Sequence, residues 1–182
     1  MTKLKRSEYI LKIISNAVLV IFFSMVQTNL LVSLRWPWNF FNLILSIVIF
    51  ITVILNYHRG LWFALFSGLI IDLFSFLPFG TMTAAMLLTV IIINGLFKNF
   101  FTNRSLYSLI ILGFLGNIVY FVFFLFINLV FFVFDITNNL DIFFTPANLY
   151  GFLWQTIFNV SLLAFLFFVF NFVSKKLKSV FY

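Results

Sequence analysis

The chain has 182 residues, of which 64% are hydrophobic, 23% are aromatic and only 8% are charged. A soluble domain needs far more charge on its surface, so a soluble enzyme is excluded. The mean hydropathy of +1.20 and the recurring apolar runs of helical length instead predict a protein embedded in a lipid bilayer. With no cysteine, one histidine and four acidic residues, the chain offers little for thiol chemistry, disulfides or metal binding, and we expect neither a cofactor nor enzymatic activity.

Six apolar segments are long enough to be transmembrane helices. In chain order they cover residues 10–34, 40–57, 60–77, 81–97, 106–134 and 148–173. Barrel strands would be only about ten residues long, with alternating polarity. The prediction is therefore an all-α polytopic membrane protein with a single domain over residues 1–182, in which only His58 and Arg59 separate the second and third helices. We expect the first helix to be retained, because its apolar run is too long for a cleavable signal peptide.

The basic residues indicate how the chain is oriented. With six spans, ten of the eleven lysines and arginines fall on one side of the membrane and only Arg35 falls on the other. The ten are Lys3, Lys5, Arg6, Lys12, Arg59, Lys98, Arg104, Lys175, Lys176 and Lys178. Because cytoplasmic loops accumulate lysine and arginine, both termini are predicted to be cytoplasmic. The formal charge of +7 is then an orientation signal first and an attraction to anionic membrane lipid second, and no nucleic acid partner is expected.

The third segment carries a stripe of small residues that ends in a carboxylate. Gly60, Ala64, Gly68 and Asp72 are four residues apart, so they share one helix face. Small residues allow helices to approach closely within a membrane, and a carboxylate that points into lipid costs several kcal/mol. This face is therefore expected to contact protein, a polar cavity or the outer headgroups.

Polar residues on two other segments are candidate neighbours of Asp72. Gln155 and Asn159 lie four residues apart on the last segment, with Gln155 at about the depth of Asp72, and Asn117 lies on the fifth. An amide–carboxylate cluster is therefore plausible. Three interpretations remain open: a polar clamp that fixes helix packing, part of a surface that receives a partner's transmembrane helix, and a proton or solute site.

The stretch Gly68-Leu-Ile-Ile-Asp72-Leu-Phe-Ser75-Phe-Leu-Pro78-Phe-Gly80 resembles the signature hairpin of the rod shape-determining protein MreD family. That signature reads glycine, three apolar residues, aspartate, an apolar pair, serine, a short turn and glycine. Between Ser75 and Gly80 the family often has small residues, whereas this chain has Phe-Leu-Pro-Phe. Length, the basic amino-terminal tail and the final apolar helix followed by lysines agree with the family as well.

The resemblance implies a non-enzymatic scaffold subunit of the bacterial cell-elongation complex in the cytoplasmic (inner) membrane. Its direct partner would be an MreC-like protein with one membrane helix. Through that protein it would work with the actin-like MreB, the polymerase RodA and a class B penicillin-binding transpeptidase. The implied fold resembles that of the membrane-embedded substrate-binding subunits of energy-coupling-factor transporters.

Two other functions remain as alternatives. A substrate-binding subunit of a vitamin transporter would commonly carry an Ala-x-x-x-Ala pattern on its first helix, where this chain has Ile13, Ala17 and Ile21 at four-residue spacing. A small proton-coupled carrier would be expected to have paired ionisable groups near the middle of the membrane, and the sequence predicts none.

Overall fold

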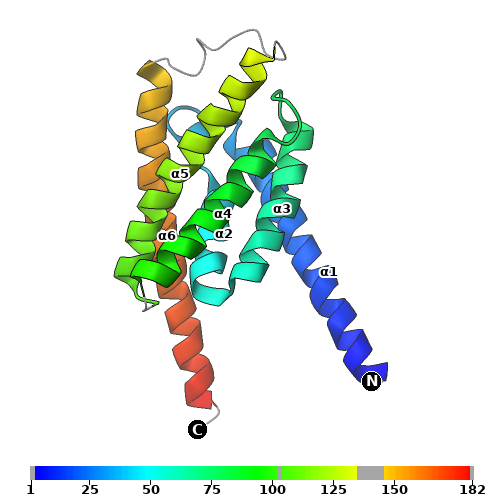
Figure 1. Cartoon of the computed structure of the whole chain (residues 1–182). Coiled ribbons are helices and arrows are strands. Elements are labelled where there is room, and N and C mark those ends of the chain that lie inside the picture. The colour runs from blue at the N-terminus through cyan, green and yellow to red at the C-terminus, as the bar shows by residue number, and fades with distance from the viewer. Residues whose placement is uncertain (1–2, 102–103, 135–145, 181–182) are drawn as a thin grey trace.

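The computed structural model describes residues 3–101, 104–134 and 146–180, and side chains within 14–101, 104–134 and 150–173 (Figure 1). Its helices are α1 (Lys3–Met25), α2 (Leu43–Phe50), α3 (Tyr57–Phe74), α4 (Thr81–Phe100), α5 (Leu106–Val133) and α6 (Pro146–Val180). Two π-helical segments, η1 (Val26–Leu31) and η3 (Ile51–Leu55), continue α1 and α2, and a 3₁₀ turn, η2 (Trp38–Phe40), precedes α2. No β-strand occurs in the described residues, so the predicted all-α class is confirmed for them.

Four helical stretches in the described part of the chain are long and apolar enough to cross a membrane. They are Ile14–Leu31, Thr81–Phe100, Leu106–Val133 and Tyr150–Val173. Large apolar side chains on these stretches are well exposed, for example Val18, Phe126 and Phe165. An apolar surface of this extent suits contact with lipid tails and not with water. The chain is therefore an α-helical membrane protein.

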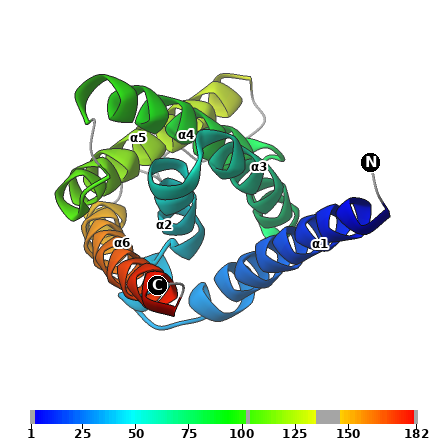
Figure 2. The ribbon, with the colours of Figure 1, turned by 90° about the horizontal axis from the view of Figure 1, so that it is seen from below.

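Helix α2 and its continuation η3 lie at the centre of the bundle (Figure 2). Ile44, Leu45 and Val48 are completely buried, and α3, α4, α5 and α6 all contact α2. The helix begins at a side-chain cap, because the Oδ1 atom of Asn42 accepts the N–H of Leu45 at 3.0 Å. Together, α2 and η3 cover only Leu43–Leu55. Their central position shields this short element from the surroundings of the bundle.

The start of α3 corrects the predicted boundaries of the second and third helices. Asn56 is extended and caps α3 by accepting the N–H of His58 at 3.2 Å, so α3 begins at Tyr57 instead of residue 60. His58 and Arg59 consequently lie in the first turn of α3 and do not form the connection. Helix α3 also ends earlier than predicted, at Phe74 instead of residue 77, because Ser75 is extended.

The other helices differ from their predicted ranges mainly at their ends. The first begins at Lys3 instead of residue 10, and its π-helical continuation ends at Leu31 instead of residue 34. Helix α4 continues to Phe100, and α6 covers Pro146–Val180 instead of 148–173. Apolarity marks the part of a helix that suits lipid, whereas the helical backbone can continue into polar sequence beyond it.

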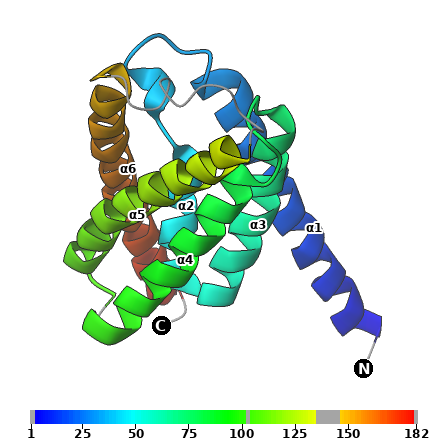
Figure 3. The same ribbon diagram turned by 45° about the horizontal axis from the view of Figure 1, so that its top comes forward.

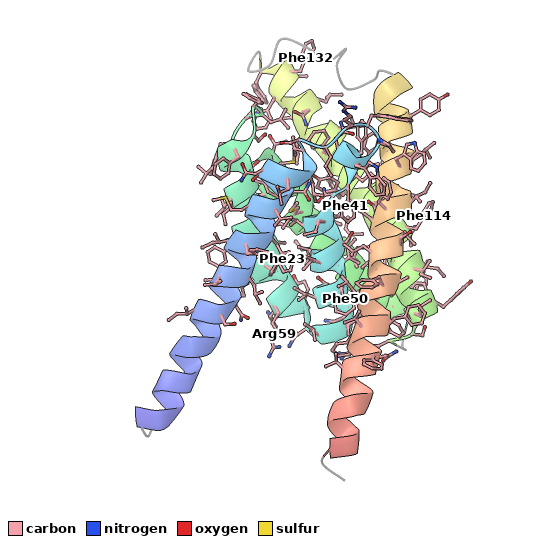
Figure 4. All side chains as sticks on the ribbon, turned by 180° about the vertical axis from the view of Figure 1, so that it is seen from behind. Phe23, Phe41, Phe50, Arg59, Phe114 and Phe132 are labelled. Carbon is pink, nitrogen blue, oxygen red and sulfur yellow. The ribbon has the colours of Figure 1, made fainter. Side chains whose placement is uncertain are left out.

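The two ends of the bundle differ in the elements and residues that lie there. We call the end with the turn between α3 and α4 the upper end, and the end where α1 begins and α6 finishes the lower end (Figure 1). Arg59 lies toward the lower end (Figure 4). At the upper end, the segment after η1 crosses toward α6 before it turns down into α2 (Figure 3). Trp38 of this segment stacks on Phe158 of α6, with 4.7 Å between ring centroids.

Candidate functional site

Asp72 lies in the last turn of α3 and is 3% exposed. Its Oδ1 atom accepts the N–H of Met82 at 2.9 Å, and its Oδ2 atom accepts the N–H and the hydroxyl of Thr83 at 3.0 and 2.5 Å. Met82 and Thr83 are the second and third residues of α4, whose first N–H groups have no acceptor within the helix. The carboxylate thus accepts the N–H groups that an N-cap side chain would accept, because Gly80, the N-cap residue of α4, has no side chain. Its charge faces the positive end of the α4 dipole.

The turn between α3 and α4 is built by hydrogen bonds from both sides. The hydroxyl oxygen of Ser75 accepts the N–H of Leu77 at 3.0 Å, and the hydroxyl of Thr81 donates to the carbonyl of Pro78 at 2.6 Å. Gly80 has φ +94° and ψ −10°, a left-handed conformation that residues with a side chain adopt at a cost. The turn therefore directs the start of α4 back toward Asp72.

Gly68 brings the two helices together below this turn. A Cβ atom at Gly68 would lie 2.7 Å from the Cα atom of Thr83, which is too close for any pair of atoms that cannot move apart. The missing side chain lets the α4 backbone approach α3, and this approach brings Thr83 within reach of Asp72. Gly68, Asp72, Ser75, Pro78 and Gly80 thus form one structural unit, which we call the capped hairpin.

The rest of the small-residue stripe is also covered by the chain itself. Gly60 is buried against Thr52 of η3, whose Cα atom would lie 3.0 Å from a Cβ atom at Gly60. Ala64 is completely buried. The whole face from Gly60 to Asp72 packs inside the bundle, so it is not open to a helix from another protein.

The predicted amides form a separate group and not a cluster with Asp72. The Nδ2 atom of Asn159 donates to the Oδ1 atom of Asn117 at 2.7 Å, and the Nδ2 atom of Asn117 donates to the carbonyl of Gly113 at 2.8 Å. Both asparagines are completely buried and join α6 to α5. None of the three predicted neighbours is among the hydrogen-bond partners of Asp72, so the expected amide–carboxylate cluster is wrong.

This asparagine pair is expected to be energetically coupled. Replacing both Asn117 and Asn159 by leucine should reveal a coupling free energy of about 1 kcal/mol in a double-mutant cycle, because each substitution removes the same interhelical hydrogen bond. Unfolding of the purified protein in detergent is the measurement. Asn128 is a matched control, since it is buried on α5 and its Nδ2 atom donates only to Phe124 of its own helix. Equal coupling of Asn159 with Asn117 and with Asn128 would contradict the prediction.

Gln155 lies elsewhere, on a cavity of about 360 Å³ near the upper end. The lining consists of amides and large apolar or aromatic side chains, without a charged residue. They are Gln27, Asn39, Phe40, Phe41, Asn42, Met82, Tyr120, Phe121, Phe124, Leu125, Phe152 and Gln155. A cavity of this size and composition suits an uncharged molecule with aromatic or apolar parts.

Gln27 is the polar residue that the sequence reasoning missed. Its Nε2 atom donates to the carbonyl of Phe41 at 3.0 Å and its Oε1 atom accepts the N–H of Leu43 at 2.8 Å. One amide thereby ties η1 to the segment that leads into α2 and closes one side of the cavity. A glutamine inside an apolar helix is itself a signal, because lipid alone does not favour it.

The described residues contain no group of three or more histidine, cysteine, aspartate or glutamate side chains that could hold a metal ion. No protein-family model, no curated protein and no solved structure matches the chain. The capped hairpin and the cavity beside it are therefore interpreted from their own geometry.

Proposed function

We propose that the chain is a membrane scaffold subunit of the bacterial cell-elongation complex, as its resemblance to MreD proteins implies. The observation that carries the proposal is the capped hairpin. The residues of the resemblance act together there: Gly68 allows the close approach, Asp72 caps α4, and Ser75 and Gly80 shape the turn. The residues that carry the resemblance thus share one structural task in this chain, which supports reading them as a single motif and not as scattered identities.

The proposed topology has six membrane crossings, with both termini in the cytoplasm of a bacterial inner membrane. Four stretches are by themselves long and apolar enough to cross a membrane. For the other two crossings, α2 with η3 and α3, the support is burial: the other helices surround α2, and Asp72 is bonded within the bundle. Basic residues on the two terminal segments and around Arg59, Lys98 and Arg104 agree with a cytoplasmic lower end.

The absence of cysteine makes this topology directly testable. Single cysteines introduced at Arg59 and at Arg35 should react with a membrane-impermeant thiol reagent from opposite sides of sealed membranes. The cysteine in Arg59→Cys should be protected in intact cells and become reactive after permeabilisation. The cysteine in Arg35→Cys should react both in intact and in permeabilised cells. Labelling of both positions from the same side would overturn the six-crossing proposal.

In this function the partner is an MreC-like protein, and through it MreB, RodA and the class B transpeptidase. Because the stripe from Gly60 to Asp72 is filled by the chain itself, the partner's membrane helix must use another surface. Exposed apolar side chains on α1, such as Val18 and Phe22, and on α6, such as Phe168, belong to the surface that remains.

Co-expression with the MreC-like protein of the same bacterium tests the proposal. The two chains should co-purify, and a photocrosslinker at one of the exposed positions on α1 or α6 should capture the partner, whereas one at the buried Ala64 should not. Depletion of the chain should round the cells. A well-folded chain that captures no MreC-like protein, in cells that keep their shape without it, would refute the proposal.

The cavity favours a second candidate function, substrate binding for a vitamin transporter. Its volume of about 360 Å³ and its aromatic and amide lining would suit a small uncharged heterocycle. Screening uncharged vitamins for an increase in the unfolding temperature tests this candidate. Stabilisation by one of them that is lost in Gln155→Leu, with the unfolding temperature of the free protein unchanged, would support it over the scaffold.

A further inference from the structure

A second cavity, of about 280 Å³, lies where the turn between η3 and α3 meets the end of α4. Residues from η3, α3, α4 and the segment before α5 line it: Thr52, Leu55, Asn56, Tyr57, His58, Asn94, Phe97, Lys98 and Arg104. The elements that line it, among them the start of α3 and the end of α4, lie at the lower end of the bundle, away from the turn between α3 and α4 (Figure 1).

The charge of this cavity has one sign. Lys98 and Arg104 contribute two formal positive charges, His58 is a further lining residue, and no aspartate or glutamate is among the lining residues. The Nη1 atom of Arg104 donates to the carbonyl of Ile54 at 2.8 Å, which holds the guanidinium over the end of η3. A guanidinium has five N–H donors, so further donors remain for an anion.

The cavity also lies at a particular depth in the bundle. Leu55 is the last residue of η3, Lys98 is in the last turn of α4, and Arg104 comes just before α5 begins at Leu106. Exposed aromatic side chains at Phe100 and Tyr107 flank the same level. Apolar helices ending together, with aromatic and basic residues at their ends, are typical of the boundary between the hydrocarbon layer and the headgroups.

We infer that this cavity is a binding site for the phosphate group of an anionic phospholipid. Lysine and arginine donors recognise phosphate oxygens by charge-assisted hydrogen bonds, and basic pockets between membrane helices are suited to anionic headgroups. The lining also contains Leu55 and Phe97, which would contact the first carbons of the acyl chains. A soluble phosphate would use the same donors but not these apolar residues.

The test uses the purified full chain in detergent. It is titrated with dioleoyl phosphatidylglycerol, with dioleoyl phosphatidylcholine and with inorganic phosphate, while native mass spectrometry counts bound lipid and thermal unfolding reports stabilisation. Phosphatidylglycerol should bind and raise the unfolding temperature more than phosphatidylcholine, which has the same acyl chains. Lys98→Gln should weaken phosphatidylglycerol binding about fivefold, because one positive charge near the headgroup is lost.

Arg59→Gln is the matched control, since Arg59 is an exposed charge in the first turn of α3 that does not line the cavity. Lys98 is also exposed, so Lys98→Gln should unfold at the same temperature as the unaltered protein when no lipid is added. An equal loss of phosphatidylglycerol binding in Lys98→Gln and Arg59→Gln would mean that the basic residues attract the lipid without a defined site, and it would overturn the proposal. Equal binding of the two lipids, or stabilisation by inorganic phosphate as strong as that by phosphatidylglycerol, would overturn its assignment to an anionic lipid.

Discussion

Replacing Asp72 by leucine is expected to destabilise the protein by about 3–5 kcal/mol, because the N–H groups of Met82 and Thr83 and the Thr83 hydroxyl would lose their buried acceptor. Asp72→Asn keeps one oxygen acceptor and should give an intermediate loss. Thr83→Val removes only the hydroxyl bond and should cost about 1 kcal/mol. Unfolding of each purified variant in detergent measures these differences.

Leu73→Ala is the control for the Asp72 series, because Leu73 is the next residue along the chain and is largely exposed. Its stability should stay close to that of the unaltered protein. If Asp72→Leu were as stable as Leu73→Ala, the carboxylate would not be the cap of α4. The interpretation of Asp72 as a polar clamp that fixes helix packing would then be refuted.

Gly68→Ala is expected to destabilise the protein by about 1–3 kcal/mol, and Gly68→Leu by more, because a side chain there would press on the backbone of α4 at Thr83. Backbone cannot rotate away as a flexible side chain can, so the two helices would have to separate. Separation would also lengthen the hydrogen bonds of Asp72 to α4. Unfolding in detergent measures the loss, and the yield of folded protein should fall with it.

Gly95→Ala provides a matched comparison on α4. A Cβ atom at Gly95 would have no neighbour within 4 Å, so the substitution should be stabilising by about 0.5–1 kcal/mol through helix propensity. Opposite signs of the change in unfolding free energy for Gly68→Ala and Gly95→Ala would show that the close approach of α4, and not glycine flexibility, is the reason for a glycine at position 68. Equal effects would contradict this account.

The candidate site was predictable only in part, and Asp72 illustrates the limit. The cost of a carboxylate in lipid predicts that Asp72 faces protein, a polar cavity or the outer headgroups, and the structure shows it buried against α4. The groups that it binds, at Met82 and Thr83, become its neighbours only when the turn at 75–80 closes. Counting along the helix predicts that Gln155 lies at the depth of Asp72, yet Gln155 lines the cavity without a hydrogen bond to Asp72. Residue counting gives height along a helix, whereas packing decides which side of the bundle a residue faces.

Composition and apolar patterning by themselves determined that this is an all-helical membrane protein, because helices satisfy their backbone hydrogen bonds locally and apolar runs need no tertiary partner to be recognised. Tertiary structure alone decided that α2 is the centre of the bundle, that the stripe from Gly60 to Asp72 is filled from within, and that Asn117 pairs with Asn159. These features join residues that are far apart in the chain. Their energies depend on distances that exist only after the helices have packed.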